Sequence, residues 1–244
     1  LCFSAVFTLN EEAEVLDKWF GRTVIHSDRR FTYEEAQQII ETGKGDFAEE
    51  VLTLNRLAQR MRKTRFKHGA VSFQREEAKF KLDAEGKPLS VYFKEQKEAN
   101  QLIEEFMLLA NKQVAEFCGH HKVNGRAVRR TMVYRVHDVP NEEKLEKFRT
   151  FVLRFGYVFK ADKGRAVAKE MNKLFKQIKG TTEENAVSTM AVRSMAKAFY
   201  TTDNIGHYGL AFPFYTHFTS PIRRYPDMMV HRLLARYLEG GKSA

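Results

Sequence analysis

The chain has 244 residues, of which 43% are hydrophobic, so it can bury a substantial core in one large domain or two small ones. No apolar run reaches the roughly 18 to 20 residues of a membrane span, and the first residues do not form a secretory signal. The two cysteines, Cys2 and Cys118, are too few for a disulfide framework. The composition predicts a protein of a reducing compartment, which we take to be the cytoplasm, with no membrane span.

The net charge of +10 is concentrated in one part of the chain. Residues 121–180 hold 16 lysines and arginines against 6 aspartates and glutamates. Such a local excess favours a polyanionic partner, nucleic acid ahead of a membrane surface. The alternative is that these lysines and arginines are ordinary solvated helix faces.

The predicted elements alternate short strands with longer helices, and no repeat or linker divides them. Alternating apolar residues predict strands at residues 2–9 and 22–26. Thr32 with Glu35 forms a capping box that starts a helix, and Asp46 with Glu49 starts another that runs to about Lys67. Further strands are expected at residues 70–74, 79–83 and 90–94, the last two joined as a hairpin across AEGKP.

The second half is predicted to be mainly helical. A wide apolar stripe predicts a mostly buried helix over residues 95–118, which Gly119 ends. A strand is expected at residues 131–136, a helix from Thr181 to about Tyr200, and a last helix that ends near Gly240. Strands segregated from helices favour an α+β domain, with a mixed or antiparallel sheet flanked by helices, over residues 1–244 as one unit.

Two stretches place polar chemistry on predicted helices. In RRFTYEEAQ, Tyr33 lies in the first helical turn, where its ring could stack on a base or could simply pack over the helix start. In LIEEFMLLAN, Glu104 lies nearly in line with Asn111 along one border of the apolar stripe, and Glu105 lies on the opposite border. A carboxylate there needs a partner, which is either an arginine or the hydroxyls of a bound ligand.

The stretch TSPIRRYPD gathers two arginines at a predicted helix start. Ser220 can cap the helix, and the N–H groups of a helix N-terminus together with Arg223 and Arg224 suit phosphate oxygens. Pro226 would either kink this helix or mark SPIRRY as a turn, with the regular helix beginning near Asp227. The alternative is a capped helix with surface arginines, although cations are disfavoured at this end of a helix.

These stretches together resemble the catalytic domain of the ribonuclease II and ribonuclease R family, most closely its bacterial ribonuclease R branch. The segments that carry the resemblance occur in the family's order through the whole chain: WFGRTVIHSDRRFTYEEAQ, GAVSFQREEAKF, LIEEFMLLAN, YRVHDVP and HYGLAFPFYTHFTSPIRRYPDMMVHRLL. The resemblance implies a processive, Mg²⁺-dependent exoribonuclease that degrades single-stranded RNA from its 3′ end and releases nucleoside 5′-monophosphates.

The resemblance also implies roles for individual residues. Arg223 matches an arginine that stabilises the scissile phosphate, and Glu104 matches a glutamate that holds the terminal ribose, with Glu105 as the alternative. Tyr33 and Phe73 match residues that contact and stack on the terminal nucleotides. Three further residues are expected near the RNA without an assigned role: Tyr215, His217 and Arg224.

The family's metal-binding aspartates have no counterpart in this sequence, so no metal site is expected within it. The resemblance implies that the chain is the C-terminal part of the catalytic domain, with its Mg²⁺ ligands upstream of residue 1, and that it is inactive alone. The alternative is a non-catalytic RNA-binding or ribosome-associated module of the same fold, which could also bind structured RNA. A third possibility is a basic helical scaffold without affinity for RNA.

Overall fold

The computed structural model describes residues 1–72, 77–94, 96–119, 122–123, 126–128, 130–161 and 164–243. Its helices are α1 (Tyr33–Thr42), α2 (Ala48–Lys67), α3 (Glu98–Gly119), α4 (Glu142–Leu153), α5 (Arg165–Ile178), α6 (Glu184–Ser194), the short 3-10 helix η1 (Tyr208–Leu210) and α7 (Tyr225–Leu238). Its strands are β1 (Cys2–Leu9), β2 (Val15–Thr23), β3 (Glu77–Leu82), β4 (Pro88–Lys94), β5 (Lys122–Val123), β6 (Arg126–Ala127), β7 (Tyr134–Val136) and β8 (Phe199–Thr201). The predicted α+β class is confirmed.

The strands pair two by two, always antiparallel: β1 with β2, β3 with β4, β5 with β6, and β7 with β8. Alternation along β1 and β2 turns one face of that hairpin inward, where the rings of Phe20 and Phe117 lie 5.2 Å apart and Phe3 meets His231 at 5.3 Å. The hairpin thereby covers part of α3 and α7. A mixed or antiparallel sheet was predicted, and the structure distributes antiparallel pairing over small separate sheets.

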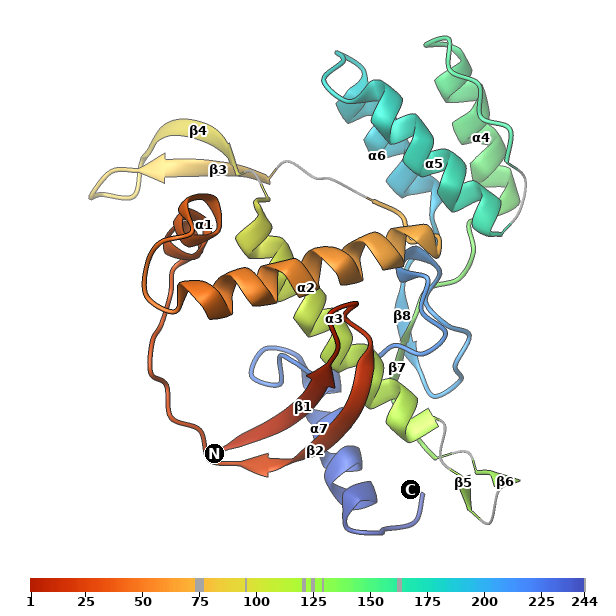
Figure 1. The fold of residues 1–244 in the computed structure, drawn as a ribbon. Helices are drawn as coiled ribbons and strands as arrows, with labels where there is room; N and C mark the ends of the chain where they lie inside the picture. The colour runs from red at the N-terminus through yellow and green to blue at the C-terminus, as the bar shows by residue number, and fades with distance from the viewer. Residues whose placement is uncertain are drawn as a thin grey trace.

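Helix α3 is the central element, and α2 crosses it (Figure 1). Two hydrophobic cores lie on either side of the β7–β8 pair. One joins β1, β2, α3, β7 and α7, and the other joins α4, α5 and α6, which pack together at one corner of the molecule. No helix in the described part of the chain combines the length and apolar character needed to cross a membrane.

Several boundaries differ from the prediction. The capping box of Thr32 is confirmed, and the Thr32 hydroxyl accepts the N–H of Glu35. The helix expected to run to Tyr200 ends at Ser194, because Phe199–Thr201 pairs with β7 instead. Residues 70–72 are not a strand, and the rest of that expected strand lies outside the described residues. Helices α4 and α5 are not among the predicted elements.

The last helix resolves the two alternatives for Pro226. Helix α7 begins at Tyr225, so Pro226 lies in its first turn, where a missing N–H costs little. Residues 220–224 form a turn in which the Ser220 carbonyl accepts the N–H of Arg223 (3.3 Å) and of Arg224 (3.1 Å). The prediction that Ser220 caps the helix is wrong, because Arg224 occupies the N-cap position of α7 and no side-chain hydrogen bond caps the helix. The Ser220 N–H donates to the carboxylate of Asp227.

Candidate functional site

The two neighbouring glutamates of α3 have different surroundings. The side chain of Glu105 is 3% exposed and faces Arg65 of α2, whose side chain is 5% exposed. Arg65 Nε donates to Glu105 Oε2 (3.2 Å), its terminal nitrogen donates to Oε1, and Arg62 lies 3.5 Å away. Glu105 and Arg65 therefore form a buried internal ion pair between α2 and α3.

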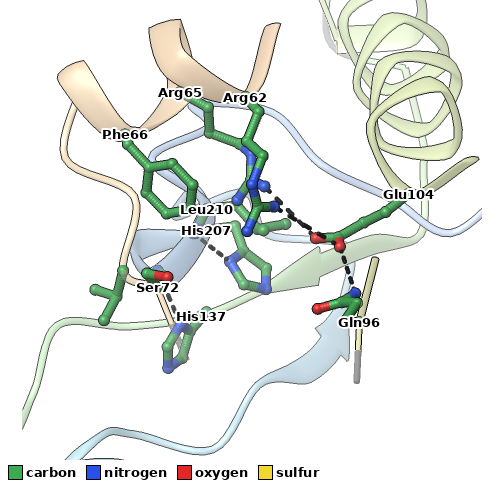
Figure 2. A pocket seen from close by; sticks show the side chains of 11 residues that line it. Arg62, Arg65, Phe66, Ser72, Gln96, Glu104, His137, His207 and Leu210 are labelled. Atoms are coloured by element: carbon green, nitrogen blue, oxygen red, sulfur yellow. Dashed lines mark hydrogen bonds and ion pairs between the residues drawn. The ribbon is translucent and has the colours of Figure 1, made fainter. Parts of the chain in front are cut away.

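Glu104 instead lines a pocket of about 250 Å³. Its side chain is 36% exposed and accepts a hydrogen bond from Gln96 Nε2 (3.0 Å), while Arg65 lies 3.5 Å from its other oxygen. Arg62 and Arg65 point into this pocket from α2, and Gln96 approaches from the opposite side (Figure 2). A carboxylate with this exposure keeps lone pairs available for the hydroxyls of a ligand.

Two histidines line the inner wall of the pocket, and both are neutral. The Gly209 N–H donates to His137 Nδ1 (3.0 Å), so the proton of His137 is on Nε2, which donates to the Ala196 carbonyl (2.9 Å). Burial lowers the pKa of His137 and lowers the pKa of His207 to about 3. The positive charge of the pocket therefore comes from its two arginines.

The two arginines of the arginine turn, residues 220–224, differ in their partners and in their exposure. The Asp227 side chain is fully buried, and its Oδ1 accepts the Ser220 N–H and an Arg224 N–H, both at 2.8 Å. Arg224 is thus neutralised internally. Arg223 is exposed and donates to Ser220 Oγ (3.3 Å), and no carboxylate of the described residues lies within ion-pair distance of it. Of the two arginines of the turn, Arg223 is the one whose guanidinium no carboxylate of the described residues neutralises.

Tyr215 and His217 lie beside this turn. Tyr215 is 5% exposed, and its hydroxyl accepts a hydrogen bond from Asn111 Nδ2 (3.2 Å). Burial raises the pKa of Tyr215 and lowers the pKa of His217 to about 4. His217 Nδ1 shares a hydrogen bond of 2.7 Å with the Tyr200 hydroxyl. Both side chains are neutral near pH 7, and Tyr215 is interior.

The predicted stacking residues are described only in part. Tyr33 is the first residue of α1 and is 44% exposed. Helix α1 lies against the N-terminal end of α3, where the Gln37 side chain accepts the Ala99 N–H (3.0 Å). Tyr33 lies one helical turn before Gln37 on α1, and Glu104 lies five residues after Ala99 on α3. Phe73 lies outside the described residues, although Val71 and Ser72, which precede it, line the pocket.

Arg62, Arg65 and Asp227 were not predicted as site residues. The arginines are three residues apart and so share one face of α2, which is the signal that could have indicated partners for the glutamates. Asp227 had a weaker signal, as an acidic residue in the first turn of a helix that follows two arginines.

The carboxylates of this region do not form a magnesium site. Mg²⁺ binds through one or two carboxylates together with waters and phosphates. Glu104, Glu105 and Asp227 are each paired with an arginine. Across the described ranges, no three acidic, histidine or cysteine side chains gather closely enough to hold a metal ion.

Comparison with known sequences identifies the family. The sequence model of the RNB domain matches residues 1–240. The chain belongs to the RNB domain family. Among curated RNB proteins, DIS3-like exonuclease 2 of Schizosaccharomyces pombe is 39% identical over 98% of this chain and 28% of its own length. Ribonuclease R 1 of Lactococcus lactis is 34% identical over 97% of this chain and 29% of its own length.

Another RNB relative, of Arabidopsis thaliana, is described as an inactive exonuclease DIS3L2. It is 35% identical over 98% of this chain and 24% of its own length. The chain therefore spans less than a third of the length of these curated relatives. Similarity at this level is shared by active and inactive members.

Solved structures confirm the RNB fold. RNase R of Mycoplasma genitalium in complex with ribose-methylated single-stranded RNA has a TM-score of 0.82 at 23% identity, covering 97% of this chain and 36% of that one. The same enzyme in complex with double-stranded RNA has a TM-score of 0.83 at 23% identity, covering 96% of this chain and 41% of that one.

Proposed function

We propose that this chain holds the 3′ end of single-stranded RNA within a hydrolytic exoribonuclease that releases nucleoside 5′-monophosphates. The observation that carries the proposal is the contrast between the two arginines of the turn. Arg224 is bound to the buried Asp227, whereas Arg223 is exposed with its charge uncompensated among the described residues. A fork-shaped donor in this position suits the phosphate whose charge grows as the bond to the leaving oxygen breaks.

We further propose that Glu104 binds the terminal ribose. Its exposed carboxylate in a pocket with two arginines can accept hydrogen bonds from the 2′- and 3′-hydroxyls, and the 2′-hydroxyl separates RNA from DNA. Glu105 and Tyr215 are interior, and we assign them to support of the site rather than to contact with RNA. Tyr33 and Phe73 supply stacking, which tolerates any base.

The hydrolysis is proposed to use Mg²⁺, which would activate water and neutralise charge on the phosphate. The carboxylates of the described residues do not fit that ion, so we propose that its ligands lie outside the chain and that the 244 residues alone bind RNA without cleaving it. The partner is the free 3′ end of single-stranded RNA, with ribosome-associated or structured RNA as a further partner. The cytoplasm is the expected location.

The test uses the full-length product of the gene that encodes this chain and a 5′-labelled oligoribonucleotide with Mg²⁺. We expect stepwise shortening from the 3′ end with release of mononucleotides. Arg223→Ala should lower turnover about 100-fold, because removing one donor to transition-state charge costs that much, and should change RNA affinity less than about threefold. Arg232→Ala, an exposed arginine two turns into α7, is the matched control and should be silent.

The second candidate is a non-catalytic RNA-binding module, which the inactive Arabidopsis relative favours. It predicts RNA binding by the full-length product with no mononucleotide release under any Mg²⁺ concentration. A scaffold without RNA affinity predicts neither binding nor release.

A further inference from the structure

Asn111 is a buried side chain of α3 that makes three hydrogen bonds to one distant segment. Its Oδ1 accepts the N–H of Phe218 (2.8 Å) and of Thr219 (3.2 Å), and its Nδ2 donates to the Tyr215 hydroxyl (3.2 Å). The residue is 3% exposed. Burying an amide is costly unless it is hydrogen-bonded, and here both ends of the amide are used on the same short segment.

The other bonds of that segment run to different elements. The Arg135 N–H of β7 donates to the Tyr215 carbonyl (3.0 Å), and His231 Nε2 of α7 bonds the Phe218 carbonyl (2.8 Å). In the part of the chain that the structure describes, Asn111 alone provides side-chain hydrogen bonds from α3 to residues 215–219. Within the described residues, Asn111 is therefore the hydrogen-bonded link between α3 and this segment, beside the core packing of Phe218 with apolar residues of α3.

The segment leads directly into the arginine turn, and α3 also carries Glu104. Asn111 and Glu104 are seven residues apart, which is about 10.5 Å along the axis and nearly in line around it. One rigid helix thus carries the pocket carboxylate at one level and the support of the turn two turns further on. Asn111 thus links the helix that carries Glu104 to the segment that leads to Arg223.

We infer that Asn111 is a positioning residue that fixes the arginine turn relative to Glu104, so that one terminal nucleotide reaches the ribose and phosphate contacts together. The inference rests on the proposed function. Asn111 itself touches no substrate and acts through the turn. A misplacement of about 1 Å at a catalytic donor can cost about 100-fold in rate, so removing this support should affect turnover before it affects RNA affinity.

A double-mutant cycle separates positioning from stability. Asn111→Ala and Arg223→Ala are combined in the full-length product, and single-turnover cleavage and RNA affinity are measured. Gln113→Ala is the matched control, because Gln113 is also buried on α3 but bonds Lys18 of β2 (2.8 Å) rather than the turn. Asn111→Asp is the conservative variant, since it keeps an acceptor for both N–H groups and the Tyr215 hydroxyl can turn to donate to it.

We expect Asn111→Ala to slow cleavage at least about tenfold with RNA affinity within about threefold, and Asn111→Asp to recover to within about threefold of wild type. Arg223→Ala should cost about 100-fold in the wild-type and Gln113→Ala backgrounds, but less than about tenfold after Asn111→Ala. Thermal unfolding of each variant confirms that it is folded at the assay temperature. If Asn111→Ala unfolds, Asn111→Ser, which leaves a smaller cavity, takes its place.

The two proposals fail differently. If Arg223→Ala costs the same in the Asn111→Ala and Gln113→Ala backgrounds, Asn111 has only a structural role and the inference is overturned while the proposed function stands. If the wild-type protein releases no mononucleotide, or if Arg223→Ala has no effect in it, the proposed function and the inference fall together.

Discussion

The different surroundings of Glu104 and Glu105 lead to opposite predictions for two adjacent substitutions. Glu105 is 3% exposed and paired with Arg65, whereas Glu104 is 36% exposed and lines the pocket. Glu105→Ala should therefore destabilise the fold, and Glu104→Ala should affect RNA. Each variant is the control for the other, because the two residues are neighbours on α3 and each substitution removes one glutamate carboxylate.

The expected magnitudes follow from burial. Removing one partner of a buried ion pair costs about 3–5 kcal/mol, because the remaining charge stays buried and unpaired. Arg65 keeps Glu104 at 3.5 Å and the Phe66 ring at 4.9 Å, so we expect the lower end of that range for Glu105→Ala. About 3 kcal/mol corresponds to a fall in Tm of roughly 6–12 °C for a chain of this size. Glu104→Ala should cost less than about 1 kcal/mol.

Thermal and urea unfolding of the 244-residue chain measures both values. The double variant Arg65→Met/Glu105→Leu should return to within about 1 kcal/mol of wild type, since replacing a buried pair by apolar residues is often neutral. RNA affinity, measured on the full-length product, should fall about tenfold for Glu104→Ala on losing charge-assisted hydrogen bonds to ribose hydroxyls. The reasoning is refuted if Glu105→Ala is no more destabilising than Glu104→Ala, or if Glu105→Ala alone weakens RNA binding.

Three further predictions concern the arginine turn and the histidines. Arg224→Ala should lower the free energy of unfolding by about 3 kcal/mol in urea unfolding, because it leaves the Asp227 carboxylate buried and unpaired; an unchanged midpoint would contradict this. Burial holds the pKa of His207 at about 3, below its unfolded value near 6.5, so the unfolded state binds more protons between these values and stability should fall as pH drops through that window. In urea unfolding across pH 7 to 4.5, the free energy of unfolding of His207→Asn should fall less steeply than that of wild type. Parallel pH profiles of the two proteins would argue against His207 as the cause. Gly209→Ala should lower the free energy of unfolding by about 1–3 kcal/mol, because its Cβ would lie 2.8 Å from His137 Nδ1; a Tm equal to that of wild type would exclude this contact.

The helices with strong local signals could be predicted from the sequence. The Thr32 capping box, the apolar stripe of α3 and the hairpin across AEGKP are all determined by residues within a turn or two of each other, and each appears in the structure. The predicted helix end at Tyr200 is wrong because the structure of this segment depends on a residue contact that is distant in the sequence. Phe199–Thr201 pairs with β7, more than 60 residues away, and local periodicity does not report such a contact.

In the candidate site, too, the features set by nearby residues could be predicted, and those set by distant contacts could not. Helical geometry places Glu104 and Asn111 on one line, which the sequence predicts. Which of the two glutamates forms the buried ion pair with Arg65 depends on how α2 crosses α3, and the sequence does not determine this crossing. Likewise, two adjacent arginines are equivalent in the sequence, and only the folded position of Asp227 shows that Arg224 is bound and Arg223 is free for a ligand.

The central claim is that Arg223 acts on the scissile phosphate of RNA. Its most direct test is the cleavage rate and RNA affinity of Arg223→Ala in the full-length product, measured on 5′-labelled single-stranded RNA beside Arg232→Ala. We predict a fall of about 100-fold in turnover with affinity within about threefold of wild type, and no change for the control. Equal losses in turnover and affinity, or the same loss in both variants, would contradict the claim.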